Sequence, residues 1–227
     1  VDFTFVDHEI STTGTTISAN PVYRVTSNVD VAVFASDPII NAAFNDSSLV
    51  LPVPTLGKRY RVANFKQAQN SAQAHVIVVA TATGTTNVKL FDASETQVEN
   101  VNLTTGQCLQ RLVNVDMTGW EVVADQPVAA FSGSEATSIG ASACCADTLL
   151  EQLLPETKLA QAYVVAPLRT RPINCSTSCS ADLFRFVATQ DGTSLTTSPN
   201  VGGGTLNAGD YLEFATSTPF LIQGDQP

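Results

Sequence analysis

Apolar and polar residues alternate over short stretches along almost the whole chain. Runs rich in Val, Thr, Phe and Tyr are separated by turns rich in Gly, Asn, Asp and Pro, which recur about every 8 to 12 residues, a spacing typical of β-sandwiches and β-barrels. The pattern therefore predicts an all-β fold. The predicted strands are 1–6, 22–26, 30–35, 58–65, 75–82, 86–91, 97–103, 107–113 and 120–124, with 38–49 irregular.

One segment, 147–154, allows a helix. Its sequence is Asp-Thr-Leu-Leu-Glu-Gln-Leu-Leu, Asp147 is a suitable N-cap, and Pro155 would end the helix. The alternative for the same residues is a loop with a single turn.

One phrase recurs along the chain: an aromatic residue, an aliphatic residue two positions later, a polar turn, and then Val-Ala-x-Phe. It occurs at 23–34 and at 120–131, and its first half occurs again at 220–227. The second half of this last copy would begin beyond Pro227. Because each half has the pattern of a strand, the last copy predicts an unfinished sheet.

Further matches extend this phrase to an internal repeat of about 100 residues. The matched segments are 51–63 with 154–166, 78–85 with 186–193, and 103–106 with 206–209. The repeat predicts two tandem β-sandwich or jelly-roll lobes. The predicted domains are an N-terminal strand and connector at 1–20, a first lobe at 21–119 and a second lobe at 120–227.

The first five residues alternate apolar and polar side chains, and they are predicted to donate the missing strand to a neighbouring subunit. These donor residues are Val1, Asp2, Phe3, Thr4 and Phe5. The predicted acceptor edge is Phe220, Leu221, Ile222 and Gln223. The chain would then join identical subunits head to tail. Alternatively, the missing strand follows in the same polypeptide, as in a tandem polyprotein.

Composition and charge narrow the classes of partner. Apolar residues make up 44% of the 227 residues and charged residues 14%, and the net charge is −10. The acidic surface argues against nucleic acid and anionic membranes as partners. No apolar run approaches the roughly 18 residues of a membrane-spanning helix.

The cysteines and glycosylation motifs favour an extracellular location. The disulfide candidates are Cys144, Cys145, Cys175 and Cys179, with the pairing left open. Asn-x-Ser/Thr motifs make Asn45, Asn102 and Asn174 candidates for glycosylation. Cys108 is expected either as a buried free thiol or as the partner of Cys144 or Cys145.

No catalytic, metal or cofactor site is predicted. The chain has two histidines, His8 and His75, and lacks a Gly-x-Ser-x-Gly elbow, so a Ser-His-Asp triad is not expected. Adjacent cysteines are poor zinc chelators, and no Cys-x-x-Cys pair occurs.

Several segments resemble a known family. Residues 125–133, 145–155, 163–168 and 184–193 are similar to consecutive phrases of the N-terminal module of the IgG-Fc-binding protein family. The similarity is good over 120–227 and looser over 22–113. The resemblance implies an extracellular, non-enzymatic, β-rich binding or structural module.

Two functions follow as hypotheses. The first is a structural subunit of an extracellular filament or matrix that uses the donor and acceptor residues above. The alternative is a glycan- or protein-binding adhesin module from a longer secreted protein.

Overall fold

The chain folds almost entirely into β-strands, as the alternation predicts. The computed structural model describes residues 13–19, 22–38, 45–66, 72–138, 146–168 and 181–227. The first strands are β1 (Gly14–Ser18), β2 (Val33–Pro38), β3 (Asn45–Val50), β4 (Gly57–Arg61), β5 (Ala74–Ala80), β6 (Thr85–Phe91), β7 (Gln97–Thr104) and β8 (Cys108–Val113). The remaining strands are β9 (Glu121–Thr137), β10 (Asp147–Gln152), β11 (Ala162–Val165), β12 (Asp182–Val187), β13 (Thr193–Ser198), β14 (Gly204–Leu206), β15 (Tyr211–Thr216) and β16 (Phe220–Gly224). Two short 3₁₀ turns are η1 (Val53–Thr55) and η2 (Glu156–Lys158).

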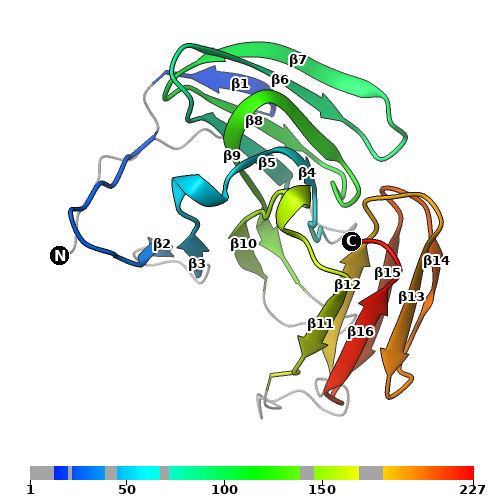
Figure 1. Ribbon diagram of the computed structural model, residues 1–227. Coiled ribbons are helices and arrows are strands. Elements are labelled where there is room, and N and C mark those ends of the chain that lie inside the picture. The colour runs from blue at the N-terminus through cyan, green and yellow to red at the C-terminus, as the bar shows by residue number, and fades with distance from the viewer. Residues whose placement is uncertain (1–12, 20–21, 39–44, 67–71, 139–145, 169–180) are drawn as a thin grey trace.

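Strand β9 is the longest strand and connects two layers (Figure 1). Its first half pairs with β4 and β6, and its second half pairs with β5 and β10. The sequence predicted a strand at 120–124 that ended at the polar residues that follow. Residues 125–127 instead carry the strand from one set of neighbours to the other.

The core lies between these two sets of strands. Side chains from β5 and β8 meet side chains from β6 and β9 in one buried cluster. Its central members include Val76, Val78, Leu90, Leu109 and Val122, all no more than 1% exposed. Burial of this apolar surface holds the two layers together.

The segment at 147–154 is neither a helix nor a loop with one turn. Residues 147–152 form β10, which pairs antiparallel with the second half of β9. A Cβ at Gly133 would lie 1.8 Å from the carbonyl oxygen of Leu149, so this glycine lets the two strands approach. Strand pairing therefore overrides the helical pattern of the leucines.

The N-terminal predictions need correction at their boundaries. Strand β3 runs through part of 38–49, which was predicted irregular, and pairs with β2. Residues 22–26 form no strand, and the strand predicted at 30–35 begins at Val33. The strand predicted at 1–6 lies outside the described residues.

The C-terminal strands repeat an order found earlier in the chain. The earlier part contains the neighbours β4-β9-β6-β7, and the later part contains β11-β16-β13-β14. Likewise β5 pairs with β8, and β12 pairs with β15. The division into two lobes stays a prediction, and β9, placed in the second lobe, pairs with β4, β5 and β6 of the first.

Candidate functional site

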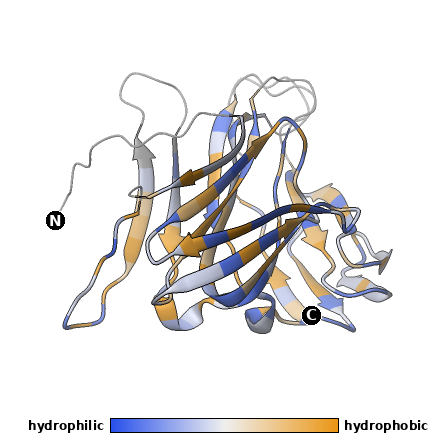
Figure 2. Ribbon diagram, turned by 90° about the horizontal axis from the view of Figure 1, so that it is seen from above, coloured by the Kyte–Doolittle hydropathy of each residue, from blue (hydrophilic) through white to orange (hydrophobic). Residues whose placement is uncertain are grey.

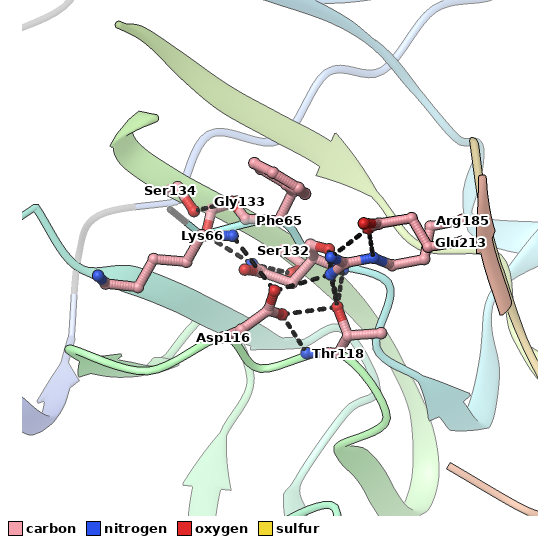
Figure 3. Close-up of polar contacts among 10 residues, drawn as sticks. Phe65, Lys66, Asp116, Thr118, Ser132, Gly133, Ser134, Arg185 and Glu213 are labelled. Carbon is pink, nitrogen blue, oxygen red and sulfur yellow. Dashed lines mark hydrogen bonds and ion pairs between the residues drawn. The ribbon is translucent and has the colours of Figure 1, made fainter. Parts of the chain in front are cut away.

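Arg185 is the centre of a polar network between strands that are distant in the sequence (Figure 3). Its guanidinium lies 2.7 Å from Asp116 Oδ2 and 2.5 Å from Glu213 Oε2. It also donates to the carbonyl of Asn64 at 2.7 Å and to Thr118 Oγ1 at 2.6 Å. Arg185 therefore links the β12–β15 pair to the segments that follow β4 and precede β9.

Two aromatic rings flank the same guanidinium. The Arg185 Cζ lies 5.0 Å from the centroid of Phe65 and 4.3 Å from that of Tyr211. Cation–π contacts of this kind favour a planar guanidinium over a lysine ammonium. The network thus depends on arginine at this position.

The network favours the ionised form of the Asp116 carboxylate. Burial alone would raise the pKa of Asp116, but hydrogen bonds from Thr118 and Arg185 outweigh it and hold the pKa below its ordinary value. Burial would likewise lower the pKa of Arg185, whereas Asp116 and Glu213 raise it. The charges of Arg185, Asp116 and Glu213 therefore stabilise the contact between the β12–β15 pair and the segment before β9.

Two turns touch close to this network. Gly119 has a φ of +85°, and a Cβ built there would lie 2.1 Å from the carbonyl oxygen of Gly209. Arg61 donates to the Gly119 carbonyl at 3.0 Å. The turn before β9 and the turn before β15 therefore meet through backbone atoms.

An open sheet edge lies beside these contacts. Within the described ranges, β12 pairs with β15 and with no other strand. Phe184 and Phe186 of β12 lie 5.4 and 6.0 Å from the ring of Phe220. Both side chains are half-buried, whereas Val76 and Val78 on the corresponding strand β5 are fully buried.

Tyr60 and Tyr163, which match in the repeat, also differ in burial. The Tyr60 hydroxyl accepts from the Gly57 amide at 2.8 Å and donates to the Val128 carbonyl, and its side chain is fully buried. The Tyr163 hydroxyl accepts from the Ala160 amide at 2.9 Å, but Tyr163 is 43% exposed. Among the described residues, no carbonyl takes the place of Val128 beside Tyr163.

Comparison with known proteins identifies the family. The model of the family described as IgGFc binding protein matches residues 46–227. The chain belongs to the IgGFc binding protein family. It is 31% identical over 182 residues to the human IgGFc-binding protein, covering 74% of this chain and 3% of that protein. No solved structure matches.

This family membership confirms the resemblance stated from 125–133, 145–155, 163–168 and 184–193. The chain spans only a small part of its human relative, so the activity of that whole protein does not transfer directly. No helix in the described part of the chain is long and apolar enough to cross a membrane.

The predicted acceptor residues of this family member do not form an edge. Phe220 to Gln223 lie in β16, which pairs with β11 on one side and β13 on the other. Leu221, Ile222 and Gln223 take part in both ladders and Phe220 in the ladder with β11, so β16 lies between two strands and is not an edge. The predicted donor residues 1–5 lie outside the described residues.

The other predicted sites are placed as follows. Cys144, Cys145, Cys175, Cys179 and Asn174 lie outside the described residues. Cys108 is a buried free thiol in the structure, and burial raises its pKa. Asn45 begins β3, and Asn102 is exposed on β7, where it accepts a hydrogen bond from Asn87 at 2.9 Å. Glycosylation of these residues stays a prediction.

His75 lies on β5 with its Nε2 buried. Burial lowers its pKa to about 4, and none of the described residues forms a hydrogen bond with its Nε2. No group of three or more His, Cys, Asp and Glu residues in the described ranges is placed to hold a metal ion.

Sequence reasoning missed the Arg185 network and the edge of β12. Arg185 was noticed only within the phrase 184–193, and nothing in the sequence links it to Asp116 or Asn64. The edge of β12 could have been found from the repeat, because β12 aligns with β5 and the partner of β5 is the Val-Ala-Ala-Phe half of β9.

Proposed function

We propose that the chain is a non-enzymatic binding module of a longer secreted protein and that its partners are other extracellular proteins. The family match over 46–227 carries this proposal, because it includes most of the described strands. The human relative is named for binding IgG Fc, which makes Fc the first partner to test. A glycan partner is the alternative within the same class.

Exposed apolar side chains support a protein partner. Tyr23, Val25, Val29, Val31 and Phe34 are each at least half exposed and follow one another on the segment before and within β2. Figure 2 shows hydrophobic stretches along this extended segment near the N-terminal end. Concentrated exposed apolar surface of this kind marks protein-interaction sites.

The test is a titration of the whole chain with IgG Fc, using intact Fc and enzymatically deglycosylated Fc. We expect saturable binding of both forms with similar affinity. Binding of intact Fc alone would support glycan recognition instead. Absence of binding to both forms at concentrations of tens of micromolar, where weak complexes are still measurable, would refute Fc as the partner.

A second candidate is a structural role in which subunits join head to tail. The unpaired edge of β12 favours it, since open edges attract further strands. The acceptor would then be β12, and the donor need not be residues 1–5.

A further inference from the structure

The largest sheet of the described residues has eight strands, with the order β1-β8-β5-β9-β6-β7 and with β4 and β10 also paired to β9. It contains a complete four-strand arrangement in the order β10-β9-β5-β8. Strand β5 has β8 on one side and the second half of β9 on the other, and β10 follows β9. Val128 and Ala130 of β9 are buried against β5 in the core. This arrangement shows what a completed lobe looks like.

The β2–β3 pair corresponds to β9–β10 in sequence and in register. Phe34 lies opposite Leu49 as Phe131 lies opposite Gln152, and Ser36 lies opposite Ser47 as Gly133 lies opposite Leu150. The phrase Val31-Ala-Val-Phe34 likewise matches Val128-Ala-Ala-Phe131. Yet no strand in the described ranges takes the place of β5 beside β2.

The β12–β15 pair corresponds to β5–β8. Asp182 lies opposite Thr216 as Ala74 lies opposite Val113, and Val187 lies opposite Tyr211 as Val79 lies opposite Cys108. The turn hydrogen bonds also agree: Gly106 donates to Ala80 and Gly209 donates to Ala188. The β12–β15 pair therefore lacks a strand in the place that β9 takes beside β5. The β2–β3 pair corresponds to β9–β10 and can supply that strand.

The exposure of side chains on β2 and beside β12 agrees with a match between these two strands. Val31 is 58% exposed and Phe34 is 66% exposed, although the corresponding Val128 is fully buried. On the other side, Phe184 and Phe186 are half-buried and Tyr163 is 43% exposed. Two half-covered apolar surfaces with matching strand edges are favourable partners.

We propose that the β2–β3 pair of one copy of this chain docks on the open edge of β12 in a second copy. The order β3-β2-β12-β15 would then reproduce β10-β9-β5-β8. The register of β9 on β5 places Val33 opposite Phe186 and Ala32 opposite Val187, with the Val31 carbonyl at the Tyr163 hydroxyl. This proposal specifies the contact for the second candidate function, in which subunits join head to tail, and it does not depend on Fc binding.

The geometry makes the contact heterologous. Figure 1 places the β2–β3 pair and β12 on opposite sides of β10, so the two surfaces of one copy face different neighbours. A heterologous contact propagates into longer assemblies unless its rotation closes a ring. Association is therefore expected to continue beyond the dimer.

The test uses sedimentation velocity of the full chain over a concentration series, with two single variants. Val33→Asp places a charge on the donor strand, and Tyr163→Lys places one beside the acceptor. We expect assembly of the unmodified chain and monomers for each variant alone. An equimolar mixture of the two variants should give a dimer and nothing larger, because it retains one intact contact.

Tyr163→Phe is the mild variant in the same experiment. Loss of one hydrogen bond of about 1.4 kcal/mol is expected to weaken association about tenfold. Circular dichroism verifies that every variant is folded. Unchanged assembly of Val33→Asp would overturn the proposal. So would an unmodified chain that stays monomeric up to millimolar concentration, because the edge of β12 would then bind no second copy.

A disulfide test checks the register. A copy with Ala32→Cys is mixed with a copy carrying Val187→Cys, because directly opposed strand residues are within disulfide reach. The control replaces Val187→Cys by Phe186→Cys, whose side chain lies on the other face of the strand. We expect covalent dimers from the first mixture only. Equal yields from both mixtures would contradict the proposed register and the docking.

Discussion

Single residues show how closely the described strands depend on each other. Tyr60 is fully buried and connects the Gly57 amide to the Val128 carbonyl, so one side chain joins the start of β4 to the middle of β9. The sequence identified Tyr60 only as a repeat position. Its hydrogen bonds could not be predicted, because Val128 lies 68 residues away.

Replacing Tyr60→Phe should destabilise the chain by about 1 to 3 kcal/mol, since the buried Gly57 amide loses its acceptor. The matched control is Tyr163→Phe, because Tyr163 is 43% exposed; this change should cost the monomer less than about 0.5 kcal/mol. Urea unfolding of both variants at a concentration without assembly measures the difference. Equal losses would show that the Tyr60 hydroxyl is not a buried link.

His75 predicts how stability depends on pH. Burial lowers its pKa from 6.5 to about 4, so the unfolded chain binds the proton more strongly than the folded chain. The stability that this histidine contributes is present above pH 6.5 and is lost as the pH falls towards 4. Linkage gives a loss of roughly 3 kcal/mol across that range.

The measurement is urea unfolding between pH 7 and pH 4 for the unmodified chain and for His75→Leu. The variant should lose less stability over this interval, whatever its stability at pH 7. Parallel curves for the two proteins would mean that His75 titrates normally in the folded chain.

Strands and turns show which elements the sequence determines. The strands β5 to β8 were predicted within two residues at each end, because regular alternation and Gly84 mark them clearly. Strand β9 was not recognised as one strand, since Asp125, Gln126 and Pro127 have the composition of a turn. The exchange of partners at these residues depends on two layers that local sequence does not encode.

The turn at Gly119 contacts the turn at Gly209, and this is one of the contacts between the later and the earlier strands. Gly119→Ala should be more destabilising than Gly84→Ala by at least about 2 kcal/mol, because the new Cβ meets the Gly209 backbone. Gly84 has a similar φ of +94° with nothing within 4 Å, so its variant measures backbone strain alone. Thermal unfolding compares the two, and similar losses would contradict the contact between the turns.

At the scale of the whole molecule, Arg185 joins parts of the chain that the sequence could only place in separate repeats. Its partners Asn64 and Asp116 lie 121 and 69 residues away. The repeat predicted that later strands would resemble earlier ones. It could not predict how the two sets pack, because the Arg185 contacts do not recur at the matching repeat position within the part of the chain that the structure describes.

Arg185→Gln should therefore loosen β12 and β15 more than β5 and β8. The change removes both ion pairs, and we expect a loss of about 1 to 3 kcal/mol for the C-terminal strands. Limited proteolysis with peptide mapping measures this, with Arg24→Gln on the exposed N-terminal segment as the control. Equal cleavage in both parts of the chain would contradict a linking role for Arg185.

The open edge of β12 is most directly tested by hydrogen exchange of its amides in a concentration series. Among residues 183–187, amides that point away from β15 should exchange quickly in dilute solution and become protected as concentration rises. The Val33→Asp variant should keep fast exchange at every concentration. Protection that is the same at all concentrations, in both proteins, would show that this edge accepts no strand from another copy.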